Sequence, residues 1–217
     1  MYRRRNRKLW VSGMGPEIPD PDAVGWNPAD MGTGITLSEG NFLATRNSGV
    51  AAAYRQAHGV TQHGTGKWYY ELEVVRIVTL VGMGLGATGD VLTHFLGSGT
   101  FCMGVYTGGH YEPGTIANYV GVGAMSVGDI VSVAVDMDTD KFWMRKNGGP
   151  WSGAVVGAGD PATGAGGKSI NTGMIGASNI VISVVMHNGG SGGDSVRLNS
   201  GNAPWAYTPP TGFSPWG

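Results

Sequence analysis

The fold is indicated most clearly by one stretch of the sequence, Gly66-Lys67-Trp68-Tyr69-Tyr70-Glu71-Leu72-Glu73-Val74. After the opening glycine, its side chains alternate with a period of two, which is the repeat of a β-strand. One face carries Trp68, Tyr70, Leu72 and Val74, and the other carries Lys67, Tyr69, Glu71 and Glu73. The pattern predicts a half-buried strand whose aromatic residues anchor a hydrophobic core.

The composition fits one domain built from many short strands. The chain has 217 residues, 40 glycines and only 13% charged residues, and a chain of this length can bury one sizeable core. The glycines follow no triplet repeat and alternate with apolar runs, so they predict turns rather than collagen or disorder. Cys102 is the single cysteine, which excludes a disulfide within the chain. We therefore predict an all-β protein that is stabilised by packing.

No apolar segment approaches the roughly 20 residues that a membrane-spanning helix needs. The basic start of the chain is not followed by the apolar run of a secretory signal. We therefore expect no membrane insertion and no export signal.

Basic residues are concentrated at the start of the chain. Arg3, Arg4, Arg5, Arg7 and Lys8 are five of the fourteen basic residues, which leaves nine basic against fifteen acidic residues, a net charge of −6, after position 8. This acidic remainder argues against a nucleic-acid-binding face on the domain itself.

Residues 1–25 are predicted to form an extended arm, because proline and glycine recur after the basic cluster. The arm has three interpretations: a solvated, disordered leader, a docking arm that orders against an acidic neighbour and buries Leu9 and Trp10, or a segment that contacts nucleic-acid phosphates without sequence selectivity. Residues 26–217 then form the domain.

Two hairpins and several single strands are predicted in the domain. Glu39-Gly40-Asn41 and Asp138-Thr139-Asp140 are the turns of the hairpins. The polar residues 55–64 predict a loop, and the apolar run over residues 77–85 predicts a strand that is buried on both faces or central in a sandwich. Further strands are predicted over residues 50–54, 100–106, 115–120, 180–186 and 195–198.

Four blocks in the sequence resemble SPRY domains, in the order in which that family has them. They are Trp26-Asn27-Pro28-Ala29-Asp30 with its hairpin, the stretch quoted above with Val81-Gly82-Met83-Gly84-Leu85, residues 128–148, and Ala203-Pro204-Trp205-Ala206-Tyr207-Thr208-Pro209-Pro210. The first and last blocks are similar to SPRY-like proteins of bacteriophages and prophages. The resemblance implies a bent antiparallel β-sandwich of the concanavalin-like jelly-roll type, preceded by the arm. Residues 155–193 match poorly and form a glycine-rich insertion.

Two glycine-rich segments have the spacing of nucleotide-binding loops without their context. Residues 162–169 fit a permissive phosphate-binding loop, which needs a helix directly after it, but the following residues have no helical period. Residues 84–89 fit a dinucleotide fingerprint, yet residues 90–97 are too short for the crossover helix. We expect no cofactor.

Candidate catalytic and metal motifs are also incomplete. Residues 189–193 have the glycines of a nucleophile elbow, which requires a strand-to-helix turn. Asp136, Asp138 and Asp140 resemble the start of a calcium loop that lacks its later glycine and glutamate, so a hairpin turn is favoured over a weak cation site. Two further sets are weaker: the five-residue spacing of His58 and His63 suits no metal pair, and Cys102 has the apolar neighbours of an inert thiol.

Glu71 and Glu73 would lie about 7 Å apart on one strand face, a spacing that could suit paired acid/base carboxylates. Lys67 on the same face offers charge balance, and no aromatic platform for a sugar is identifiable beside them. We predict no catalytic residues and no metal site, and therefore no enzyme.

The resemblance to SPRY domains implies a binding module, in which a rigid sandwich presents variable loops to a partner. Loops rich in glycine and in polar or aromatic residues span residues 56–65, 92–99, 108–112 and 157–169. The predicted partner-binding residues are His63, His94, His110, Tyr111 and Glu112, with an ordinary solvated loop as the alternative. His110 and Tyr111 are favoured most, because an aromatic side chain beside glycine gives rigid contact area.

These features predict a non-enzymatic virion structural protein of a bacteriophage, either a head fibre or decoration subunit or a tail fibre or spike subunit. Its arm would dock on other virion proteins, and its domain would attach to a glycan or protein of the host surface. We expect a homo-oligomer in the virion, assembled in the host cytoplasm. The alternatives are a cellular SPRY adaptor that recognises a short peptide and a glycan-processing enzyme that depends on Glu71 or Glu73. The docking residues of the arm are Arg3, Arg4, Arg5, Arg7, Lys8, Leu9 and Trp10.

Overall fold

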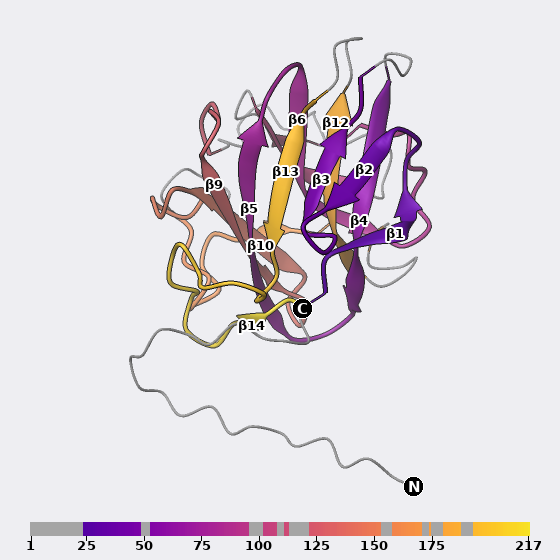
Figure 1. Ribbon diagram of the computed structural model, residues 1–217. Coiled ribbons are helices and arrows are strands. Elements are labelled where there is room, and N and C mark those ends of the chain that lie inside the picture. Colours follow the sequence, from indigo (N-terminus) through magenta and orange to yellow (C-terminus); the bar gives the residue numbers. More distant parts are fainter. Residues whose placement is uncertain are drawn as a thin grey trace, which may run out of the picture.

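The computed structural model describes residues 24–48, 53–95, 102–107, 111–112, 122–152, 158–170, 174, 180–187 and 193–217. The strands of these residues form two sheets, which Figure 1 shows as two layers of a sandwich. In spatial order, the six-stranded sheet contains β1 (Trp26–Met31), β4 (Tyr54–His63), β12 (Ile180–His187), β6 (Leu80–Ala87), β7 (Cys102–Tyr106) and β8 (Tyr111–Glu112).

The eight-stranded sheet contains the strands of both predicted hairpins and the alternating stretch that begins at Lys67. Its spatial order is β11 (Lys168–Ser169), β10 (Lys141–Lys146), β9 (Ile130–Asp136), β5 (Lys67–Arg76), β13 (Ser195–Asn199), β3 (Leu43–Arg46) and β2 (Ile35–Ser38), with β14 (Ser214–Pro215) beside β5. The β14–β5 pairing is parallel, and the other strand pairs of the described residues are antiparallel. The predicted all-β antiparallel sandwich is confirmed.

One hydrophobic core lies between the two sheets. Tyr70, Leu72 and Val74 of β5 are fully buried in it, and Trp68 packs against it while remaining partly exposed. Valines of β9 and alternate residues of β6 and β12 fill the core from both sides. The predicted inward face of β5 is therefore confirmed.

The opposite face of β5 differs from the prediction. Tyr69 and Glu71 point away from the core, yet they are buried as well, so the strand is not half-buried. The cause is the segment of residues 200–217, which returns along this face of the sheet. Lys67 is predicted to balance the charges of Glu71 and Glu73, but its ammonium lies 3.0 Å from Asp136 on the neighbouring strand instead.

Both predicted hairpins are present. Glu39, Gly40 and Asn41 all have positive φ angles between β2 and β3, and Asp140 has a positive φ in the turn between β9 and β10. Asn and Asp tolerate this left-handed region better than most residues, because their short side chains bond to the nearby backbone.

Two local predictions are wrong. Residues 55–64 are predicted as a loop, but residues 54–63 form β4, in which Ala57 faces the core while Gln56 and His58 are buried on the outer face. The apolar strand predicted over residues 77–85 begins only at Leu80. Asp194 explains the delay, because its carboxylate accepts hydrogen bonds from the backbone N–H groups of Val78, Thr79 and Leu80 and holds residues 78–80 at the edge of the turn.

Glycine is required where β6 and β7 meet. A Cβ atom on Gly84 would lie 2.1 Å from the carbonyl oxygen of Met103, and one on Gly104 would lie 2.1 Å from that of Met83. The two glycines face each other across the strand pair, so this part of the sheet closes only without side chains.

Candidate functional site

The outer face of the eight-stranded sheet is covered by an aromatic layer from the end of the chain. The ring of Trp205 packs edge-on against Tyr69 at 4.9 Å between centroids, and Phe213 lies 6.4 Å from Trp143. Arg145 lies over the ring of Trp151 at 4.3 Å and donates a hydrogen bond to the carbonyl of Thr208. This second layer contributes to the burial of Tyr69 and Glu71 on β5 and of Trp143 on β10.

Glu71 holds the covering segment in place. Its carboxylate accepts hydrogen bonds from the backbone N–H groups of Ala206 and Tyr207, each at 2.9 Å, and from the Tyr69 hydroxyl at 2.7 Å. Burial raises the pKa of Tyr69, and the negative charge of Glu71 raises it further. A carboxylate that already accepts three hydrogen bonds under a protein layer has a structural role, so the geometry does not support Glu71 as an acid or base.

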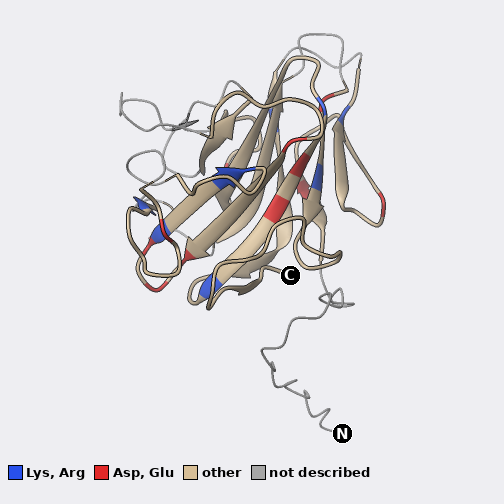
Figure 2. Ribbon diagram, turned by 90° about the vertical axis from the view of Figure 1, so that its left-hand side faces the viewer, with Lys and Arg blue, Asp and Glu red and all other residues tan. Residues whose placement is uncertain are grey.

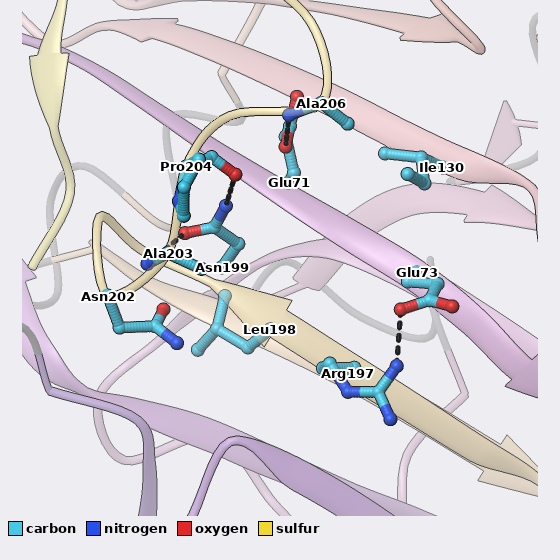
Figure 3. A pocket seen from close by; sticks show the side chains of 10 residues that line it. All are labelled: Glu71, Glu73, Ile130, Arg197, Leu198, Asn199, Asn202, Ala203, Pro204 and Ala206. Atoms are coloured by element: carbon cyan, nitrogen blue, oxygen red, sulfur yellow. Dashed lines mark hydrogen bonds and ion pairs between the residues drawn. The ribbon is translucent and has the colours of Figure 1, made fainter. Parts of the chain in front are cut away.

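We call the hydrogen bonds of Glu71 to Ala206 and Tyr207 the Glu71 clamp. A groove lies beside it, between β5, β13 and the turn of residues 199–206. Figure 3 shows its lining residues, which are Glu71, Glu73, Ile130, Arg197, Leu198, Asn199, Asn202, Ala203, Pro204 and Ala206. Glu73 points toward Arg197 in this view, and Glu71 points toward the backbone of Ala206. The two carboxylates therefore serve different partners.

The charges in the groove are paired with each other. The Arg197 guanidinium donates to Glu73 and to both oxygens of Glu39, at 2.8 and 3.0 Å. These bonds raise the pKa of Arg197 and lower the pKa of Glu39. All three side chains are exposed by a third or more, so the network is screened by solvent and contributes modestly to stability.

The amides of the groove are also used internally. Asn199 accepts from the N–H groups of Gly201 and Ala203 and donates to the carbonyl of Pro204, while Asn202 accepts from the N–H of Ser200. The amide groups of Asn199 and Asn202 thus stabilise the turn that forms one wall of the groove. A partner could contact the surface of the groove, but these amides already have hydrogen-bond partners within the protein.

His63 lies at the end of β4 and belongs to an aromatic cluster. Its ring stacks on Trp68 at 3.6 Å between centroids, and its Nε2 lies 2.8 Å from the carbonyl oxygen of Trp216. Burial lowers the pKa of His63, against a smaller opposite effect of the hydrogen bond to Trp216. The residue predicted to contact a partner thus has contacts that fasten the last residues of the chain to the core.

His94 lies elsewhere, in the strap, the name we give to residues 88–95 after β6. Its Nδ1 lies 3.1 Å from Asp90, and the Asp90 carboxylate also accepts a 2.9 Å hydrogen bond from the side-chain amide of Gln56. Gln56 and His63 are seven residues apart on β4, or about 23 Å at the usual strand rise, so the structure does not bring His94 and His63 together. They share no contact partner among the described residues.

The remaining predicted partner-binding residues are placed only in part. Tyr111 and Glu112 form β8, the edge strand beside β7. His110 and the docking residues of the arm lie outside the described residues, as do residues 50–52, 115–120 and 189–192 of the other predictions.

The incomplete motifs have structural roles where they are described. Asp136 pairs with Lys67 and accepts backbone hydrogen bonds from the turn that follows. Residues 168–169 form β11 on the edge of the sheet, instead of the helix start that a phosphate-binding loop needs. No group of three or more His, Cys, Asp or Glu in the described part of the chain is arranged to hold a metal ion. Within the same residues, no helix has the length and hydrophobicity to cross a membrane.

Charged residues are sparse over the described surface. Figure 2 shows acidic and basic positions interspersed along the strands and turns, and the view has no continuous basic band.

A polar cluster that the sequence analysis does not predict lies on the outer face of the six-stranded sheet. Gln56, His58 and Ser183 are fully buried there, and Asp90 nearly so. The available signal is the alternation of Gln56 and His58 around Ala57, which is the pattern of a strand with one polar face.

Comparison with known proteins identifies the fold. No protein-family model matches the sequence, and no curated protein matches it. Among solved structures 207 chains match the fold. One is the SPRY domain of human HERC1, with a TM-score of 0.57 and 15% sequence identity, covering 80% of this chain and 96% of that chain. The chain therefore has a SPRY-like fold.

Proposed function

We propose that this chain is a binding module without catalytic activity. The observation that carries the proposal is the SPRY-like sandwich. SPRY domains are typically binding domains, in which a rigid sandwich presents its loops to a partner. The described groove supports the same interpretation, since Glu71, Glu73 and Arg197 are bound to partners within the protein. Binding needs a stable surface, whereas catalysis needs a polar group that is left available to a substrate.

We further propose that the module is a bacteriophage virion subunit, of a head fibre, decoration, tail fibre or spike. The sequence blocks at residues 26–30 and 203–210 support a phage type, because they are similar to phage SPRY-like proteins. The charge division supports a docking arm, because Arg3, Arg4, Arg5, Arg7 and Lys8 precede a net-acidic remainder. The arm would dock on other virion proteins, and the domain would attach to a host-surface glycan or protein.

The position where the arm joins the sandwich supports this division of roles. The carbonyl of Val24 accepts a hydrogen bond from the Ser200 hydroxyl, and the carbonyl of Ser200 accepts one from the N–H of Gly217. Val24, the first described residue, therefore lies beside the covering segment, at the end of the sandwich that holds the turn of residues 64–66. The turns at the opposite end, which include residues 77–79 and 147–149, are separated from it by the length of the strands.

A pull-down with the full chain as bait tests the proposal. A virion subunit captures capsid or tail proteins from a lysate of phage-infected cells and also co-purifies with phage particles. A cellular SPRY adaptor, the second candidate, captures a protein with a defined short peptide motif and leaves particles unbound. Capture of such a peptide, with no particle protein, would replace the virion proposal by the adaptor.

A further inference from the structure

The strap of residues 88–95 lies against the outer face of the six-stranded sheet and is fastened mainly to Gln56. The backbone N–H of Gln56 donates to the carbonyl of Leu92 at 2.9 Å, and its side-chain amide bonds Asp90 at 2.9 Å. At the far end of the strap, Phe95 packs against Tyr54 at 5.5 Å between ring centroids. Gln56 is fully buried beneath these contacts.

The surroundings of Gln56 fix the orientation of its amide. Its Nε2 faces the Asp90 carboxylate and, at 3.3 Å, the carbonyl oxygen of His94, and both of these groups are acceptors. Asp90 also accepts from the N–H of Val91 at 2.7 Å. The nitrogen of the amide must therefore point to the strap, which leaves the oxygen Oε1 facing the sheet.

This orientation determines how the ring of His58 is bonded. Gln56 Oε1 lies 2.9 Å from His58 Nε2 and 3.1 Å from the Ser183 hydroxyl, so both of these groups must donate. The other ring nitrogen, Nδ1, lies 3.0 Å from the Asp30 carboxylate, which is again an acceptor. Only a doubly protonated, positively charged imidazole donates from both nitrogens.

Asp30 is suited to hold that charge. The hydrogen bond to His58 lowers the pKa of Asp30, against the opposite effect of burial. The His58 ring is fully buried, whereas the Asp30 side chain is 30% exposed. A buried ring of this kind carries a charge only when an opposite charge lies beside it.

We propose that the buried His58 ring is an acid-dependent latch for the strap. With both protons present, His58 and Ser183 hold Gln56 Oε1, and Gln56 Nε2 holds Asp90. When the ring loses its Nε2 proton, the nitrogen lone pair faces Gln56 Oε1. The amide cannot turn to relieve this contact, because its oxygen would then face Asp90 and the carbonyl of His94. The strap therefore loosens as the pH rises through the titration of the ring.

The charged and titratable groups around the latch are few among the described residues. Asp30 faces His58 from β1, and Asp90 and His94 approach Gln56 from the strap. From β12 the nearest polar group is Ser183, and from β6 it is the backbone at Gly86, where a Cβ would lie 3.1 Å from His58 Nε2. His94 is thus the one other histidine in these contacts, and the test must separate it from His58.

Nuclear magnetic resonance of the full chain tests the latch between pH 5 and 9, the range around imidazole titration. The side-chain ¹⁵N shifts of His58 report its protonation, and amide protection factors, corrected for intrinsic exchange, report the strap. We expect a doubly protonated ring at pH 5 and a fall of about tenfold in strap protection as the ring loses its proton. A ring that is neutral at pH 5, or a strap whose protection does not change with the state of the ring, would overturn the proposal. A ring that stays doubly protonated to pH 9 would also overturn it.

Matched variants identify the group responsible. Asp30→Asn keeps an oxygen acceptor for His58 but removes its charge, so the transition should move about one unit to lower pH. His94→Asn and His63→Gln should leave the midpoint in place, since the first removes the strap histidine and the second a histidine at the far end of β4. If His94→Asn abolishes the transition while Asp30→Asn leaves it unmoved, His94 carries the pH dependence and the proposal is wrong.

Discussion

Glu71 illustrates what a single residue reveals only in three dimensions. Its position in the alternating stretch predicts a side chain that points away from the core, and the structure confirms this orientation. The alternation does not reveal that residues 206–207 return over it and donate two N–H groups to its carboxylate. Such contacts join positions about 135 residues apart, and a local pattern carries no record of them.

We expect Glu71→Gln to destabilise the fold by about 1–3 kcal/mol, because the new amide nitrogen would face a backbone N–H donor that then lacks an acceptor. Urea denaturation gives the free energy of unfolding. Glu73→Gln is the matched control, since Glu73 is partly exposed and pairs with Arg197, and it should cost at most about 1 kcal/mol. Equal losses in the two variants would contradict the clamp assigned to Glu71.

His63 should make the fold less stable in mild acid. Because burial lowers its pKa, the unfolded chain takes up a proton below about pH 6.5, the ordinary range of histidine, before the folded chain does. The stability is therefore complete above that pH and falls as the pH drops toward the folded pKa. The free energy of unfolding should decrease between pH 7.5 and 5.5, and it should decrease less in His63→Gln. The latch at His58 is present in both proteins and cancels in this comparison, so an equal decrease would show that His63 stays accessible to protons in the fold.

At the scale of elements, a strand with a row of large apolar residues on its core face is predictable even where its other face is buried too. β5, β9 and the two hairpin turns follow from alternation and from glycine, Asn and Asp in the turns. β4 has polar residues on an outer face that the strap covers, so its sequence has the composition of a loop. The start of β6 depends on Asp194, which lies more than 110 residues away in the chain.

The β6–β7 pair should tolerate no side chain at its centre. Gly84→Ala would place a Cβ 2.1 Å from the carbonyl of Met103, and separating the strands to relieve this contact should cost about 3 kcal/mol. Gly89→Ala is the control, because its φ is positive but no atom lies within 4 Å of a Cβ there, and it should cost about 1–2 kcal/mol. Thermal unfolding of both variants measures the difference. A Gly84→Ala variant as stable as Gly89→Ala would mean that the two strands have room to separate.

At the scale of the whole molecule, the sequence predicts the fold better than the site. Four blocks in family order predict a sandwich, and the SPRY-like match agrees with it. The partner-binding residues are predicted from loop composition alone. The ring of His63 stacks on Trp68 and is hydrogen-bonded to the carbonyl of Trp216 instead of lying in a free loop. Composition does not reveal which polar residues a fold uses internally, so the roles of His94, Tyr111 and Glu112 in partner binding stay predictions.

The two parts of the chain should be separable in function. If the arm docks the molecule and the sandwich binds a partner, a chain without residues 1–23 keeps the sandwich intact. The contacts of Val24, Ser200 and Gly217 that close its base are retained in this variant. Its near-ultraviolet circular dichroism and unfolding midpoint should equal those of the full chain.

The most direct test of the virion proposal is the number of copies of this chain in purified phage particles, measured by quantitative mass spectrometry. Particles made with the full chain should contain it at a fixed ratio to the major capsid or tail protein. Particles made with the chain that lacks residues 1–23 should contain little or none, although the truncated domain is folded. Absence of the full chain from particles, or equal incorporation of the truncated chain, would contradict the proposal.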